Sequence, residues 1–235
     1  MATKNKVNKK SNNPLLENPD AIAEKLSSSE QWIEDNKTLV FSVVGGIVLI
    51  IGGFLFYNNY QSDQNVAAQS DMYQAQYWFE ADSLDLALNG DGNDYGFLDI
   101  IDNYGSTKAG NLARFYAGVS LLKQGDYAGA VDYLEEFNAG DKIVQARAYA
   151  LIGDAYMEQG QIEDAVSQYE KAANYNPNDY FTPTYLLKQA LAYEQLSDYS
   201  KAIGAYDQII NDFPNSDQIA NARKHKARLE AKASE

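Results

Sequence analysis

The chain has 235 residues, no cysteine and one histidine, and 33 acidic against 19 basic side chains give it a formal net charge of −14. The absence of cysteine excludes disulfides, Cys-ligated zinc, iron–sulfur clusters and thiol nucleophiles. The surplus of negative charge argues against a nucleic-acid partner, because a phosphate backbone binds basic surfaces. The composition therefore predicts a protein without enzymatic activity, cofactor or metal.

Residues 1–37 are predicted to form a tail that precedes a membrane segment. Its first part is rich in Lys, Asn and Ser and poor in apolar residues, as is typical of disordered segments. Nearer the apolar segment, Ile22, Leu26 and Ile33 recur at helical spacing, and Pro19 stands near the first helical turn. This spacing predicts a short amphipathic helix at the membrane surface.

An apolar segment follows at residues 38–57, TLVFSVVGGIVLIIGGFLFY, with twenty residues and no charge. A helix of that length spans about 30 Å, the thickness of the hydrocarbon core of a bilayer. Thirty-seven residues precede the segment and no small-x-small cleavage site follows it, which disfavours a signal peptide. We therefore predict an uncleaved transmembrane helix.

The distribution of lysine predicts the orientation of that helix. No Lys or Arg occurs at residues 58–107, directly after the span. By the positive-inside rule the N-terminus stays in the cytoplasm and residues 58–235 are exported. The lysines that precede the span are Lys4, Lys6, Lys9, Lys10, Lys25 and Lys37.

Small residues cluster on one side of the predicted span. They could allow the backbone of a second membrane helix to approach closely. Glycine is also simply common in membrane helices, so both interpretations stay open. The candidate helix-contact residues are Ser42, Gly45, Gly46, Gly52 and Gly53.

Residues 58–110 are predicted to contain a linker and a degenerate helical pair. A helical pattern runs over residues 64–88, NGDGNDYG interrupts it, and FLDIIDNYG begins another helix. The Asp and Asn side chains of the interruption could in principle bind calcium. The downstream bidentate Glu of an EF-hand is missing, however, which favours a plain polar turn.

Three later stretches superimpose as an internal repeat: GDYAGAVDYLEEF, GQIEDAVSQYEKAANYNP and SDYSKAIGAYDQIINDFP, with offsets of 35 and 37 residues. Small residues at fixed positions would let two antiparallel helices cross closely, and proline closes the last two units. These small residues are Gly118, Gly153 and Ala190 on the first helix and Ala130, Ala165 and Ala202 on the second.

This pattern resembles the tetratricopeptide repeat family over residues 111–217. The resemblance implies an all-α fold, with one N-terminal transmembrane helix followed by a helical solenoid, and residues 218–235 as a capping helix. The first copy departs from the family because Arg114 replaces the favoured Trp and no Pro follows Phe137. The connection after the first copy is therefore expected to be irregular.

The resemblance also implies a partner groove lined by the first helix of each repeat. Of fifteen corresponding positions, seven are large and apolar and two are basic, which suits an apolar extended or helical segment. The alternative is that the helices upstream, at residues 64–104, fold over Phe115 and its neighbours. The groove residues we single out are Leu112, Phe115, Val119, Leu122, Arg147, Met157, Leu187 and Leu191; the other positions are Lys123, Ala150, Asp154, Glu158, Thr184, Glu194 and Gln195.

The order of the parts is similar to that of the YfgM-type ancillary subunits of the bacterial Sec translocon. That resemblance implies a single-pass inner-membrane protein with a periplasmic domain that takes part in protein transport. The partners it implies are the SecYEG translocon, a periplasmic prolyl-isomerase-type chaperone and nascent exported chains.

Parts of the sequence also suggest two other classes of repeat protein. NDFPNSDQIANARKHKARLE is similar to the end of repeat proteins that organise outer-membrane assembly or Tol–Pal complexes, but those proteins usually lack an uncleaved span. An organelle import receptor would need the opposite topology and a basic clamp. A catalytic role finds no support, because His225 lies among basic residues as an expected surface histidine and no triad spacing is present.

Overall fold

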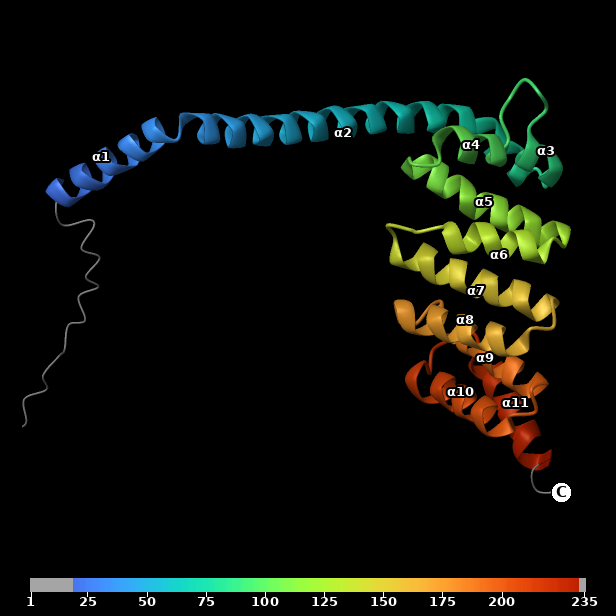
Figure 1. Ribbon diagram of the computed structural model, residues 1–235. Coiled ribbons are helices and arrows are strands. Elements are labelled where there is room, and N and C mark those ends of the chain that lie inside the picture. The colour runs from blue at the N-terminus through green and yellow to red at the C-terminus, as the bar shows by residue number, and fades with distance from the viewer. Residues whose placement is uncertain (1–18, 233–235) are drawn as a thin grey trace, which may run out of the picture. The chain divides into compact units, whose positions relative to one another are not determined.

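The computed structural model describes residues 19–232, and every regular element within that range is an α-helix. The all-α prediction is thus confirmed, whereas the expectation for the first residues of the tail lies outside the described range. The chain divides into two units, Met1–Asn59 and Tyr60–Glu235. The helices are α1 (Pro19–Asp35), α2 (Lys37–Glu80), α3 (Leu84–Asn89), α4 (Phe97–Tyr104), α5 (Lys108–Gln124), α6 (Tyr127–Glu136), α7 (Lys142–Glu158), α8 (Ile162–Tyr175), α9 (Thr182–Gln195), α10 (Tyr199–Asp212) and α11 (Ile219–Lys232) (Figure 1).

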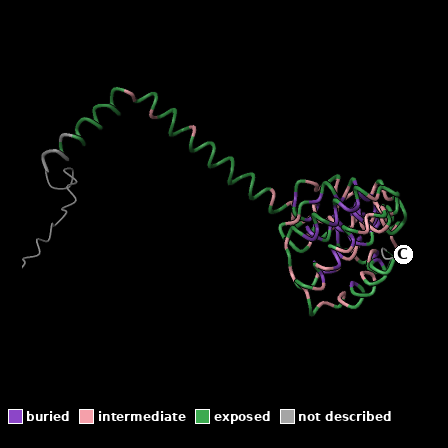
Figure 2. Tube along the Cα trace, turned by 90° about the horizontal axis from the view of Figure 1, so that it is seen from below, coloured by how far each residue is buried: buried purple, intermediate pink, exposed green. Residues whose placement is uncertain are grey.

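The first unit consists of α1 and the apolar part of α2. Helix α1 occupies the segment where the sequence predicts a short helix. Among the described helices, only α2 is long and apolar enough to cross a bilayer. Its apolar side chains are exposed, with Leu49 at 77% and Ile50 at 73% (Figure 2). A helix of this length and hydropathy is compatible with a single membrane span.

Helix α2 continues well beyond the apolar segment, to Glu80. Within the second unit it buries Ala68, Met72 and Ala75, which lie one helical turn apart on one face. The chain then turns at Asp82, whose φ is +57°, before the short helix α3. The structure therefore has a continuous helix where the sequence suggested a linker, and it divides the 64–88 pattern into two helices.

The upstream helices pack on α5 around an aromatic cluster. Phe97 is fully buried, and its ring stacks on Tyr116 with a centroid distance of 5.1 Å. Phe79 of α2 contacts Tyr116 edge-on, also at 5.1 Å. The side chain of Asn65 accepts a hydrogen bond from the Ala109 amide in the first turn of α5, at 2.9 Å. These contacts attach α2 and α4 to the first repeat.

Helices α5 to α10 form three consecutive antiparallel pairs, stacked in chain order in Figure 1. The pairs cross closely where glycine stands. A Cβ on Gly118 would lie 2.6 Å from Cγ of Leu134, and one on Gly153 would lie 2.6 Å from the ring of Tyr169. Since both distances are far below van der Waals contact, the small residues have the role that the repeat pattern predicts.

The connection between the first two repeats is irregular, as expected from the missing proline. Helix α6 has ten residues, whereas α8 and α10 have fourteen each. The chain leaves α6 at Phe137 in an extended conformation, with φ −73° and ψ 132°. The Asn111 side chain donates to the Asn138 carbonyl (2.8 Å) and accepts from its amide (3.1 Å). The last turn of a regular second helix is therefore replaced by an extended link.

The final helix, α11, packs on α10 and α9. Near its start, Ser216 Oγ accepts a hydrogen bond from the Gln218 amide at 3.1 Å. Lys226 pairs with Asp207 at 2.6 Å. His225 is half-buried, with Nδ1 at 3.2 Å from Glu194, so it is not the surface histidine that the sequence suggested. The basic residues beside His225 in the sequence suggested a surface position. In the structure, the packing of α11 instead turns the imidazole ring toward Glu194.

Candidate protein-binding groove

The first helices of the three repeats meet at a cavity of about 580 Å³. We call this cavity the groove. Its apolar lining comes from Leu122 of α5, Met157 of α7 and Leu191 of α9, and Leu191 is 36% exposed. Because these residues belong to three consecutive repeats, a ligand in the groove would contact all of them. The remaining lining residues are Lys123, Tyr127, Asp154, Glu158, Tyr169 and Lys188.

An ion pair lies across the groove between α7 and α9. Lys188 Nζ lies 2.6 and 2.9 Å from the two carboxylate oxygens of Asp154. The Tyr169 hydroxyl also donates to Asp154, at 2.7 Å. Burial of the phenol, together with the negative charge of Asp154, raises the pKa of Tyr169. The Asp154 carboxylate is thus already neutralised and hydrogen-bonded within the chain.

The other basic side chain of the groove is also paired internally. Lys123 Nζ lies 2.8 Å from Asp82 in the turn after α2, and 5.3 Å from the centroid of the Phe79 ring. Both lysines of the groove therefore have carboxylate partners from the same chain. This arrangement leaves the apolar side chains as the surface that a ligand can use, because exchanging one ion pair for another at a partly solvated site gains little.

The eight groove residues singled out from the sequence do not all reach the cavity. Leu122, Met157 and Leu191 line it. Leu187 and Val119 are half-buried, and they pack against the repeat cores. Arg147 is exposed. Leu112 lines a different cavity of about 730 Å³, beside the extended link.

Phe115 is not available in the groove. It is only 9% exposed, and its ring lies 5.2 Å from that of Phe137. Its cluster includes Val131 and Leu134 of α6 and Ile152 of α7. The cover over Phe115 therefore comes from the following helices, and not from the upstream helices that the alternative interpretation invoked. Phe115 stands at a position that lines the groove in the family, but in this chain its side chain packs at the junction between two repeats.

Three groove residues, Tyr127, Tyr169 and Lys188, are not among the groove positions expected from the sequence. Lys188 stands 34 residues after Asp154, close to the repeat offsets of 35 and 37, so repeat-to-repeat pairing of opposite charges could have found it. Tyr169 belongs to the second helix of its pair, and its phenol reaches the groove only because Gly153 lets the helices approach. Sequence spacing alone contains no such information.

Among residues 19–232, no helix packs against the glycines of the apolar segment. A Cβ added at Gly45, Gly46, Gly52 or Gly53 would meet nothing within 4 Å. Ser42 is exposed and donates a hydrogen bond to the Thr38 carbonyl at 2.7 Å. Contact with another membrane helix therefore stays a prediction. Among the described residues, no group of three or more His, Cys, Asp or Glu side chains could hold a metal ion.

Comparisons with known proteins agree with this architecture. Tetratricopeptide repeat family models match residues 151–217 and 112–139, so the chain carries tetratricopeptide repeats there. Two solved structures, "MamA RS-1 ArsTM double mutant" and "MamA 41-end from Desulfovibrio magneticus RS-1", superimpose with TM-scores of 0.52 and 0.51. Each is 18% identical and covers 74% of this chain, and the alignments cover 93% and 94% of the MamA chains. These likenesses support the fold. No curated protein matches the sequence significantly.

Proposed function

We propose that this protein is a membrane-tethered adaptor without chemistry of its own, and that its groove binds an apolar segment of another protein. The observation that carries the proposal is the internal pairing of both groove lysines, to Asp154 and Asp82. A groove that recognised an acidic peptide tail would keep its basic side chains free for the ligand. Here the surface left for a ligand is apolar, and it extends over three repeats.

We further propose that the adaptor works in the bacterial inner membrane, with its repeats in the periplasm. The support is the order of parts: a lysine-containing tail, one apolar helix and an acidic repeat domain, as in YfgM-type subunits of the Sec translocon. In this role α2 would lie against the SecYEG channel through Ser42, Gly45, Gly46, Gly52 and Gly53. The groove would hold a nascent exported chain or a periplasmic prolyl-isomerase-type chaperone.

The proposal is tested by photo-crosslinking in the full chain. A photoreactive residue in place of Gly46 or Gly53 is expected to crosslink to a translocon subunit, and one in place of Leu191 to an exported polypeptide. When the photoreactive residue replaces Met157, the additional substitution Leu191→Asp should lower the crosslinking yield at least tenfold. A charge in the groove opposes the binding of an apolar segment. Gln208→Asp, an exposed position on α10, is the matched control.

Folding of each variant is first checked by circular dichroism. A folded, membrane-inserted protein that crosslinks to no translocon subunit would contradict the Sec assignment. Equal crosslinking by Leu191→Asp and the control would contradict the groove assignment. The runner-up function, a scaffold for outer-membrane assembly or Tol–Pal complexes, requires release from the membrane, so a mature N-terminus found by mass spectrometry downstream of residue 57 would favour it.

A further inference from the structure

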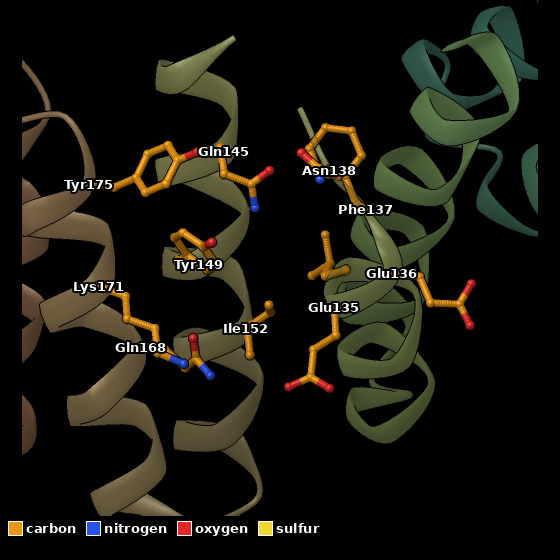
Figure 3. A pocket seen from close by; sticks show the side chains of 11 residues that line it. Glu135, Glu136, Phe137, Asn138, Gln145, Tyr149, Ile152, Gln168, Lys171 and Tyr175 are labelled. Atoms are coloured by element: carbon orange, nitrogen blue, oxygen red, sulfur yellow. The ribbon is translucent and has the colours of Figure 1, made fainter. Parts of the chain in front are cut away.

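A third cavity, of about 560 Å³, lies on the other side of the extended link, between α6, α7 and α8. We call it the repeat-junction cleft. Figure 3 shows side chains of α7 and α8 facing the end of α6, with Glu135 directed toward the gap and Glu136 away from it. The charged, amide and tyrosine side chains that line it include Glu135, Gln145, Tyr149, Gln168, Lys171 and Tyr175.

The repeat-junction cleft is separate from the groove. Both cavities use α7, but they use different faces of it. At about 100° per residue, Gln145, Tyr149 and Ile152 fall on one side of α7, and Asp154 and Met157 fall on the opposite side. A ligand in the cleft would therefore not compete directly with one in the groove.

The cleft exists because α6 is short. The residues that would form its last turn are extended instead, and the side chains of Asn111 and Gln145 hold them there. Gln145 Oε1 accepts from the Ala139 amide at 2.7 Å. On α8, Gln168, Lys171 and Tyr175 follow at helical spacing and line the vacant position. The side of α8 that faces the cleft is therefore not covered by a last helical turn of α6.

One polar atom in this wall has no partner. Gln168 is only 9% exposed, and its Oε1 finds no hydrogen-bond donor among the described residues. Buried acceptors in proteins nearly always have a hydrogen-bond partner, so Gln168 Oε1 is expected to accept from a donor outside the chain, either a water molecule or a ligand. The Oε1 atom of the neighbouring Gln145, in contrast, accepts a hydrogen bond within the chain.

The other residues that line the repeat-junction cleft indicate which kind of ligand would supply that donor. Glu135 and Lys171 are exposed and carry opposite charges on different helices. The rings of Tyr149 and Tyr175 lie 5.4 Å apart, edge to face. Amides, phenols and balanced charges suit a neutral ligand with alternating donors and acceptors. A polypeptide backbone in extended form has that pattern, and its side chains can lie against tyrosine rings.

We propose that the repeat-junction cleft is a second binding site, which takes an extended peptide segment of a partner protein and receives a backbone N–H on Gln168 Oε1. The Glu135 carboxylate then accepts from, and the Lys171 ammonium donates to, further backbone or polar groups of the same segment. The protein would thus hold two polypeptide segments at once, one on each face of α7. This inference does not depend on the proposed function of the groove.

The stability test uses the full chain in lipid nanodiscs. If Gln168 Oε1 has no hydrogen-bond partner in the ligand-free protein, Gln168→Leu removes an unsatisfied acceptor. The melting temperature of the ligand-free protein should then stay the same or rise. The matched variant Gln145→Leu breaks an existing hydrogen bond and should lower the melting temperature by about 2–4 °C or more. A fall for Gln168→Leu as large as that for Gln145→Leu would assign the site to a structural water and overturn the proposal.

The binding test uses a fluorescein-labelled octapeptide of alternating serine and leucine, followed by fluorescence anisotropy. Wild-type protein should bind it, and Gln168→Leu should weaken binding at least tenfold. N-methylation of the peptide amides should have the same effect, whereas Gln208→Asp, at an exposed position on α10 outside both cavities, should leave binding unchanged. Absence of binding by the wild type at millimolar peptide, or equal binding by Gln168→Leu, would overturn the proposal.

Discussion

Three tyrosine phenols tie helices together by donating to carboxylates. Each bond lies between 2.6 and 2.7 Å and joins residues at least twelve positions apart. Such charge-assisted hydrogen bonds are stronger than neutral ones, and they require the phenol to keep its proton. The three donor–acceptor pairs are Tyr104 with Asp71, Tyr169 with Asp154, and Tyr206 with Glu194.

These bonds predict a loss of stability at high pH. The hydrogen bond to Asp71 raises the pKa of Tyr104 to about 12, and burial raises the pKa values of Tyr169 and Tyr206. A pKa that is higher in the folded state means that the stabilisation is complete below the unfolded value of about 10 and is lost as the pH rises above it. The free energy of unfolding should therefore be constant from pH 7 to 9 and fall from pH 10 upward.

Thermal melts followed by circular dichroism across this range test the prediction. The double variant Tyr104→Phe, Tyr169→Phe should be less stable at neutral pH, because it loses two hydrogen bonds. Its stability should fall less steeply than that of the wild type between pH 10 and 12. Parallel pH profiles for the two proteins would show that other groups cause the alkaline loss.

The helices of the first two repeats cross closely because glycine stands at the crossing point. In the second repeat Gly153 of α7 faces the ring of Tyr169 of α8. Tyr169 is buried and hydrogen-bonded to Asp154, so it has little freedom to move away. A larger residue at position 153 would force the two helices apart and disturb the wall of the groove.

Two alanine substitutions test this account. Gly153→Ala should destabilise the fold by about 1–3 kcal/mol, as expected for overpacking of a dense core. Gly204→Ala is the control, because a Cβ on Gly204 of α10 would meet nothing within 4 Å. It should stabilise α10 by about 0.5–1 kcal/mol through helix propensity. Urea titration gives both values, and similar effects at the two positions would show that the crossing tolerates a methyl group.

The whole molecule combines an apolar helix with a repeat domain in one chain, and its natural lack of cysteine makes its topology measurable. In intact spheroplasts, Ser167→Cys on the exposed surface of α8 should react with a membrane-impermeant maleimide. Thr3→Cys should react only after permeabilisation if the tail lies in the cytoplasm, as the positive-inside rule predicts from the lysines beside it. Leu55→Cys should stay unlabelled within the bilayer.

The cysteine-free wild type is the labelling control. The reverse pattern, with Thr3→Cys labelled from outside, would contradict the orientation. Labelling of Leu55→Cys in intact cells would contradict the span itself.

Much of this architecture follows from local sequence signals. An uncharged run of twenty residues determines a candidate span, because a helix must satisfy its backbone within lipid and match the bilayer thickness. Small residues at offsets of 35 and 37 determine where helices can cross, as Gly118 and Gly153 demonstrate. Both signals depend on spacing within a few helical turns, so they can be read without knowledge of the neighbours.

Only the tertiary structure decided which side chains remain available to a ligand. Phe115 is covered by the following helices α6 and α7, Lys188 is paired with Asp154, and Gln168 is left without a donor beside the shortened α6. Each outcome depends on residues about twenty to forty positions away. Periodicity identifies the face of a helix on which a residue lies, but only packing determines whether another element of the chain covers that face.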